Sequence, residues 1–250
     1  MSIFSIKVIR YFWIYLLLFS LEIETVNANS IAFENANKLF ENGKYSEAIL
    51  KYKNLSANGV SANLLFNLGN AHFKSGSIGQ AMVNYQRALK LNPRHPDLIA
   101  NLNFAYKHTQ TEPIPITFQQ KWIRKLSIEE WTLITSLSVS LFLITLGIRQ
   151  LNSSLVKNKL WIKIFASISS LLVLLTVIST TDYFGNKQAF VIQKEATVHS
   201  NPVEQSPELF KVTDGMELIV LGRTREFINI QSSIGSTGWI HQNAIELTLP

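Results

Sequence analysis

The chain has 250 residues, of which 47% are hydrophobic and only 16% charged, against roughly 25% charged residues in soluble domains. It contains no cysteine, which excludes a disulfide framework, a zinc site with thiolate ligands and a cysteine nucleophile. The net charge of +6 is not gathered into a run of about five to eight basic residues, so anionic lipid headgroups are better expected partners than nucleic acid.

The first 28 residues have the composition of a secretory signal peptide. Lys7 and Arg10 form a positive region, Tyr11–Leu21 is a short apolar core, and Ala28 supplies the small residue that a signal peptidase accepts. We therefore interpret residues 1–28 as a cleaved signal, with an uncleaved membrane anchor as the alternative. Both interpretations place the following domain outside the cytoplasm.

Two stretches of the next segment repeat each other at a distance of 33 residues. This spacing of small and aromatic residues is typical of two packed antiparallel helices, with small residues where the backbones approach and aromatic residues between them. The repeated positions are Gly43, Ala48 and Tyr52 in the first copy, and Gly76, Ala81 and Tyr85 in the second. Gly76 is expected to end the first helix of a pair, and Pro93 the second.

The second copy resembles the tetratricopeptide repeat. The resemblance over 62–95 rests on Leu65, Leu68, Gly69, Ala81, Tyr85, Ala88 and Pro93, with His72 in place of the usual tyrosine. The copy at 29–61 is more degenerate, and a third copy at 96–109 stops after one helix. Because about three repeats are needed for independent stability, a repeat domain over 29–110 is expected to need a capping helix or a partner surface.

The resemblance implies that a protein partner binds to the face formed by the first helix of each pair. Asparagine amides can pair with both the N–H and the C=O groups of an extended peptide, and aromatic rings supply contact area. The alternative for each phenylalanine is a place in the core between the helices. Helical register places on or near this face the candidates Asn37, Phe66, Asn67, Asn70, Phe73, Lys74 and Asn101, together with Phe104 and His108.

Residues 111–127 are predicted to form a linker and a juxtamembrane helix. Pro113 and Pro115 enforce an extended path, after which Phe118–Leu126 interleaves apolar and basic residues. We expect this short helix to lie in the headgroup region of a membrane, with a capping helix for the repeats as the alternative. Ser127 and Glu130 have the spacing of a capping box at the start of the next helix.

Two apolar runs, Trp131–Ile148 and Ile164–Thr180, contain no Asp, Glu, Lys or Arg. They predict transmembrane helices over 128–149 and 163–182, joined by a cytoplasmic loop at 150–162 whose charged residues are all basic. Together with the signal peptide, this hairpin places both soluble domains on the periplasmic side of a bacterial cytoplasmic membrane. The absence of an ionisable residue at mid-membrane depth disfavours ion transport.

Residues 187–250 change to short β-rich runs separated by turn signals, which predicts a small barrel. The expected strands are Ala189–Ile192, Ala196–His199, Leu209–Val212, Glu217–Leu221, Phe227–Gln231 and Gly238–Ile240, followed by a final strand. The Gly238-Trp239-Ile240 stretch resembles bacterial SH3-like domains, although Phe227 replaces the tryptophan common in their central strand. The resemblance implies a peptide or peptidoglycan ligand, with Trp239 either at a binding surface or in the core.

Sequence motifs for catalysis are absent: there is no phosphate-binding loop, dinucleotide fingerprint, nucleophile elbow or HExxH. The five histidines are dispersed. We therefore predict no catalytic residue, no cofactor and no metal site, and a protein that is not an enzyme.

The predicted architecture is a multidomain membrane protein with an all-α tetratricopeptide repeat domain, a two-helix transmembrane hairpin and a small all-β SH3-like barrel. This order resembles the BatE-type proteins of bacterial aerotolerance operons. The resemblance implies a scaffold in an envelope complex with other Bat-type membrane proteins, including von Willebrand A-type components, and a MoxR-type ATPase. A transmembrane sensor that binds peptide or cell-wall ligands is the alternative function.

Overall fold

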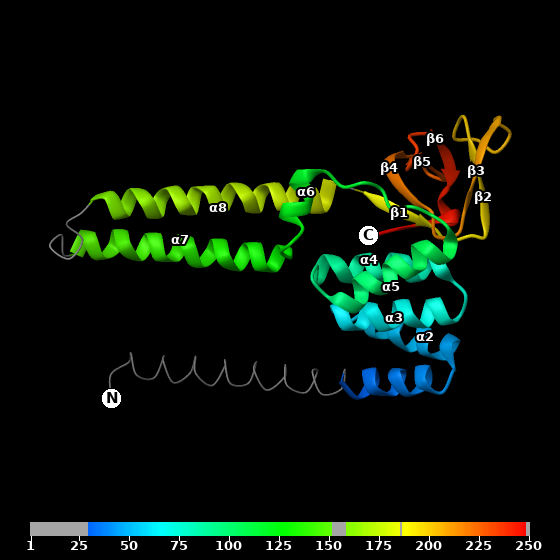
Figure 1. Cartoon of the computed structure of the whole chain (residues 1–250), viewed down its shortest axis with the longest axis horizontal. Helices are drawn as coiled ribbons and strands as arrows, with labels where there is room; N and C mark the ends of the chain where they lie inside the picture. The colour runs from blue at the N-terminus through cyan, green and yellow to red at the C-terminus, as the bar shows by residue number, and fades with distance from the viewer. Residues whose placement is uncertain (1–29, 152–158, 186, 249–250) are drawn as a thin grey trace, which may run out of the picture.

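The computed structural model describes residues 30–151, 159–185 and 187–248 (Figure 1). The predicted signal peptide and residues 152–158 of the predicted cytoplasmic loop lie outside the described residues. Figure 1 shows three parts: a stack of short helices, a sheet that lies against one end of this stack, and a long pair of helices that extends away from both.

The helical stack contains the predicted repeats. Its described elements are a helix over 30–41, α2 (Tyr45–Ser56), α3 (Ala62–Lys74), α4 (Ile78–Leu91) and α5 (Pro96–Thr109). Ser61 caps α3 because its side chain accepts a hydrogen bond from the Leu64 N–H, and Gly76 ends the same helix with a positive φ of 85°.

The repeated tyrosines and small residues form the core of the stack, as their spacing predicts. Tyr52 and Tyr85 are both fully buried, and Gly69 lies directly against the Tyr85 ring. A Cβ atom at Gly69 would stand 2.6 Å from Tyr85 Cε1, so a larger residue would push α3 away from α4. The glycine is therefore required by the close approach of the two helices.

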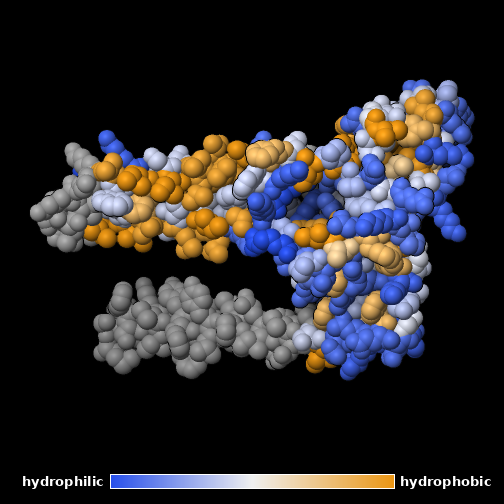
Figure 2. Space-filling view, in the orientation of Figure 1, coloured by the Kyte–Doolittle hydropathy of each residue, from blue (hydrophilic) through white to orange (hydrophobic). Residues whose placement is uncertain are grey.

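The long pair consists of α7 (Ile128–Leu151) and α8 (Lys159–Gly185), both apolar and long enough to cross a membrane. Figure 2 shows hydrophobic residues along its surface, in contrast to the polar stack and sheet. Hydroxyl groups join the two helices: Thr135 Oγ1 lies 2.7 Å from Thr176 Oγ1, and Ser138 Oγ lies 2.9 Å from Ser169 Oγ. Small polar residues of this kind hold helix pairs together in apolar surroundings.

The predicted capping box at the start of α7 is confirmed. Glu130 N–H donates to Ser127 Oγ at 3.2 Å, and Ser127 N–H donates to a Glu130 carboxylate oxygen at 2.9 Å. The same carboxylate forms an ion pair with Arg94 of the repeats.

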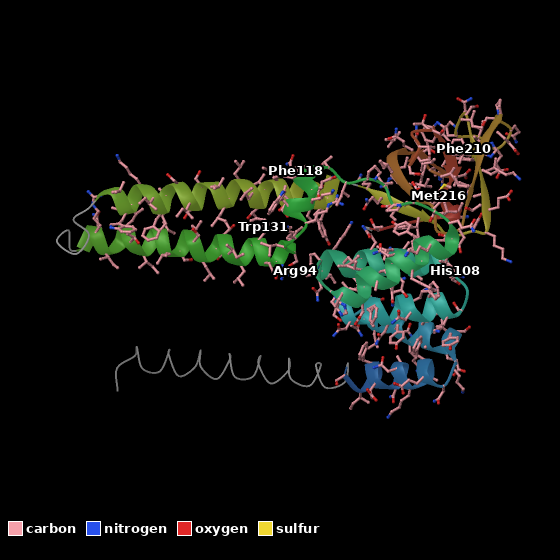
Figure 3. The ribbon with its side chains drawn as sticks, in the orientation of Figure 1. Arg94, His108, Phe118, Trp131, Phe210 and Met216 are labelled. Atoms are coloured by element: carbon pink, nitrogen blue, oxygen red, sulfur yellow. The ribbon has the colours of Figure 1, made fainter. Side chains whose placement is uncertain are left out.

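The short helix α6 (Phe118–Ile123) lies beside the end of α8. Asp182 of α8 accepts hydrogen bonds from Gln120 Nε2 at 2.9 Å and from Arg124 Nε at 2.6 Å. Phe118 is 77% exposed and Trp122 57% exposed. Figure 3 shows Phe118 and Trp131 at the same end of the long helix pair, next to the stack and the sheet.

The C-terminal part is an antiparallel sheet, and each of the six predicted strands is present. The strands are β1 (Gln188–Val191), β2 (Glu195–His199), β3 (Glu208–Thr213), β4 (Glu217–Arg223), β5 (Phe227–Ser232), β6 (Thr237–His241) and β7 (Ile245–Leu247). Their order is β3-β2-β6-β5-β4-β1-β7, and β3 does not pair with β7. The sheet is therefore not closed, so the expected barrel is confirmed only as a small antiparallel sheet.

Candidate functional site

The candidate face is formed by the helix over 30–41, α3 and α5, and we call it the first-helix face. A ladder of asparagine side chains crosses it. Asn37 Oδ1 accepts from Tyr52 Oη at 2.7 Å and from Asn67 Nδ2 at 3.0 Å. One repeat further along, Asn70 Oδ1 accepts from Tyr85 Oη at 2.8 Å and from Asn101 Nδ2 at 2.9 Å. The structure thus brings all four predicted asparagines together in two equivalent clusters.

These hydrogen bonds fix the orientation of each amide. Asn37 and Asn70 use their oxygen atoms inside the ladder, so their Nδ2 groups remain as donors among the described residues. Asn67 and Asn101 use an N–H group, so their Oδ1 atoms remain as acceptors. Two buried tyrosines support the ladder, because the hydroxyls of Tyr52 and Tyr85 donate to Asn37 and Asn70. Burial raises the pKa of Tyr52 to about 12.

The predicted phenylalanines combine the two roles considered for them, contact with a partner and packing in the core between the helices. Phe66 and Phe73 are partly buried and pack against the core of the repeats. Phe73 also contacts Phe104 and His108 of α5, with ring centroids 5.6 Å apart in both pairs. Phe104 itself is 59% exposed, so it presents most of its ring to solvent. Phe104 is therefore the strongest aromatic contact candidate on this face.

Lys74 and Trp239 take no part in the hydrogen bonds of the ladder. Lys74 ends α3 and is exposed. Trp239 is half-buried on β6, paired with His199 of β2 and Asn229 of β5, while its buried neighbour Ile240 belongs to the core of the sheet. The sheet contacts α4 through β1 and β7, and β5 and β4 separate β6 from β1. Trp239 on β6 is therefore not part of the first-helix face.

The sheet covers the opposite side of the repeats, a feature that the sequence pattern does not predict. Gly79 N–H of α4 donates to Asp214 Oδ1 at 2.9 Å, and Arg87 forms an ion pair with Glu246 at 2.9 Å. Burial raises the pKa of Asp214, against the lowering effect of the Gly79 hydrogen bond. The sheet therefore serves as the partner surface that the short repeat array was expected to need.

A buried carboxylate lies at the centre of this junction. Glu217 of β4 is only 2% exposed, and its Oε2 atom accepts from Tyr106 Oη at 2.6 Å and from the Ile114 N–H at 3.0 Å. It therefore joins the sheet, the last repeat helix and the linker through one atom. Burial raises the pKa of Glu217, although both hydrogen bonds act in the opposite direction.

Two glycines allow the backbones to approach at the junction. A Cβ atom at Gly79 would stand 1.9 Å from the Val191 carbonyl oxygen, and one at Gly215 would stand 2.8 Å from Thr109 Cγ2. Gly215 also has a positive φ of 79°, which other residues rarely adopt. A glycine inside a predicted helix, as at 79, is the one sequence signal that could have indicated this contact.

The other titratable residues of the described ranges, 30–151, 159–185 and 187–248, form no evident reaction centre. His72 is buried in the repeats, and burial, with a smaller effect of Lys53, lowers its pKa to about 4. Among the described residues, no group of three or more His, Cys, Asp or Glu side chains is arranged to hold a metal ion.

Comparison with known proteins identifies one segment of the chain. Residues 62–95 match the sequence model of the tetratricopeptide repeat. The matched segment contains α3 and α4, and hence Asn67, Asn70 and Tyr85 of the ladder. No curated protein matches the chain significantly. Repeats of this kind indicate interaction with other proteins.

Proposed function

We propose that this protein is a non-enzymatic, membrane-anchored scaffold whose first-helix face binds an extended segment of a protein partner. The asparagine ladder is the observation that carries this proposal. An extended peptide presents N–H and C=O groups along its length at about 3.3 Å per residue. The ladder offers both donors and acceptors already fixed in orientation, which lowers the entropy lost on binding.

Lys74 follows Asn70 by four residues on α3, and the exposed Phe104 follows Asn101 by three residues on α5, so both lie about one helical turn from the ladder. Aromatic residues with one exposed face often contribute a large share of binding energy at protein interfaces. We infer an internal partner segment, because Phe66 and Asp97 occupy positions where a clamp for a terminal carboxylate would need basic residues.

The two long apolar helices support membrane anchoring. In the proposed topology the repeats and the sheet are periplasmic, the signal peptide is removed, and residues 150–162 face the cytoplasm. The basic character of this loop supports that orientation. The SH3-like character of the sheet, with half-exposed Trp239, belongs to the same proposal as a second binding module for peptide or peptidoglycan.

The resemblance to BatE-type proteins motivates the choice of partners. We propose other Bat-type membrane proteins, including von Willebrand A-type components, as the proteins held by this scaffold, in an envelope complex that includes a MoxR-type ATPase. The first-helix face is the surface through which we expect at least one of them to bind.

Co-purification from detergent tests this function. We expect the wild-type chain to recover another envelope protein, and a Phe104→Ala, Lys74→Ala double variant to recover about ten-fold less, because an interface aromatic contributes roughly 1–2 kcal/mol. The matched control is Leu50→Ala with Lys51→Ala, an exposed apolar residue and an exposed lysine on α2. Equal losses in both double variants, or no envelope protein with the wild-type chain, would contradict the proposal.

A further inference from the structure

A cavity of about 240 Å³ lies where the repeats, the linker, the long helix pair and the sheet meet. Most of its wall is apolar, with contributions from Leu89, Ile99, Ile116, Leu126 and Ile128. These residues come from α4, α5, the linker and the start of α7. The cavity is therefore a product of the assembled junction and belongs to no single module.

One cation in this wall, Lys90, forms no ion pair with a carboxylate among the described residues. Lys90 Nζ donates to Thr248 Oγ1 at 3.2 Å and lies 5.3 Å from the centre of the Tyr183 ring. The other cation of the cavity, Arg124, is engaged by Asp182 through two hydrogen bonds, at 2.6 and 3.1 Å.

The surroundings of Lys90 therefore favour an anion. Burial, with the nearby charges of Arg124 and Arg87, lowers its pKa to about 8, while Asp182 acts in the opposite direction. A partly buried ammonium group gains most from a ligand that supplies charge-assisted hydrogen bonds. Gln86 and Gln188 also line the cavity and supply further amide donors.

The position of the cavity identifies the source of that anion. Ile128 and Tyr183 belong to the ends of α7 and α8 that adjoin the repeats. Phe118 and Trp122 are exposed beside the same ends, and aromatic residues of this kind concentrate at membrane interfaces. If α7 and α8 cross a bilayer, as the proposed function holds, the cavity lies at the level of the lipid headgroups.

We propose that this cavity binds the phosphate-bearing headgroup of an anionic phospholipid, with Lys90 as the cationic partner of the phosphate. The apolar wall contacts the glycerol and the first methylene groups, and the acyl chains remain in the bilayer. The volume agrees with a headgroup, since sites for whole drug-sized ligands occupy roughly 300–1,000 Å³. A soluble phosphate ester has the same chemistry at Lys90, so the test has to separate the two.

Native mass spectrometry of the full-length chain in detergent measures the binding. We expect phosphatidylglycerol to bind about ten-fold more tightly than phosphatidylcholine to the wild-type chain and to Lys90→Arg, and Lys90→Gln to lose this preference. Lys121→Gln is the matched control, because Lys121 is an exposed cation on α6 outside the cavity. It should retain the preference. A preference that persists in Lys90→Gln, or that Lys121→Gln abolishes equally, would overturn the inference.

Two further measurements distinguish a lipid from a soluble phosphate ester, and a failed cavity site from a failed membrane insertion. Glycerol phosphate should bind at least ten-fold more weakly than the lipid, and equal binding would identify a soluble phosphate ester as the ligand and overturn the lipid assignment. Flotation with phosphatidylcholine vesicles tests membrane insertion alone. A chain that floats but shows no Lys90-dependent preference contradicts the cavity site, whereas a chain that does not float contradicts the proposed function as well. The melting temperature of Lys90→Gln in detergent verifies that the variant is folded.

Discussion

Replacement of Gly79 by alanine should separate the sheet from the helical repeats. Alanine stabilises a helix by about 1 kcal/mol relative to glycine, so α4 alone would gain from the change. The added Cβ atom, however, would stand 1.9 Å from the Val191 carbonyl oxygen and 2.5 Å from Asp214 Oδ1. One of these contacts is with backbone, which cannot move aside as the end of a flexible side chain can. We expect a net destabilisation of about 3 kcal/mol or more, at the upper end of the range for overpacking.

Two measurements report this separation. The melting temperature should fall by roughly 5–10 °C, and protease should cleave the linker between Thr109 and Thr117 more rapidly. Gly222→Ala is the matched control, because a Cβ atom there meets nothing within 4 Å. If Gly79→Ala and Gly222→Ala behaved alike, the close approach of β1 to α4 would be contradicted.

Removal of the Glu217 side chain should have an effect of similar size. Glu217→Ala leaves the Tyr106 hydroxyl and the Ile114 N–H without their buried acceptor. Unsatisfied buried groups of this kind cost about 1–3 kcal/mol each, so for these two groups we expect a total loss of roughly 2–6 kcal/mol in the free energy of unfolding. Glu246→Ala is the control, since it removes a partly exposed carboxylate from the same junction and should cost less than about 1 kcal/mol.

The contribution of Glu217 to stability depends on pH in a direction that follows from its raised pKa. Burial raises its pKa above the ordinary value of 4.5, so the folded chain holds this proton more tightly than the unfolded chain. The stability that protonation contributes is complete below the unfolded pKa and is lost as the pH rises through the folded pKa. The glutamine in Glu217→Gln cannot ionise, so this variant does not lose that stability. The melting temperature of the variant minus that of the wild type should therefore rise as the pH increases from below 4.5 through the folded pKa. A constant difference between the two proteins at every pH would contradict the shift.

The sequence pattern predicts the elements of this fold well, because local rules determine them. The capping box of Ser127 and Glu130 depends on residues that are neighbours in the chain, and the structure has both of its hydrogen bonds. The six predicted strands follow from alternation and turn residues, which are equally local. Whether the sheet closes into a barrel depends on the order and twist of its strands. Neither can be predicted directly from a pattern of residues.

The junction could not be predicted, because its partners are far apart in the sequence. Gly79 and Asp214 are separated by 135 positions, and Tyr106 and Glu217 by 111. In the sequence, Glu217 is one acidic residue among many in a β-rich segment, where solvent exposure is the ordinary expectation. Its burial depends on the docking of α5 and the linker, which is a tertiary event.

The asparagines of the candidate face follow from helical register, whereas their hydrogen bonds do not. Register alone placed the four asparagines on the first helices, and the structure brings them together. The internal hydrogen bonds, which leave the donors of Asn37 and Asn70 and the acceptors of Asn67 and Asn101 for a partner, require side-chain geometry. The sheet contacts α4, which supplies the Tyr85 hydroxyl that donates to Asn70 of the ladder.

Site-specific photocrosslinking in intact cells tests the central claim, that the first-helix face holds a partner protein. Lys74 is the suitable position for the photoreactive residue, because it is exposed and takes no part in the ladder. Lys51, exposed on α2, is the matched position outside the face. We expect a discrete adduct with one envelope protein from position 74 and none from position 51. The same adduct from both positions, or an adduct from position 51 alone, would contradict it.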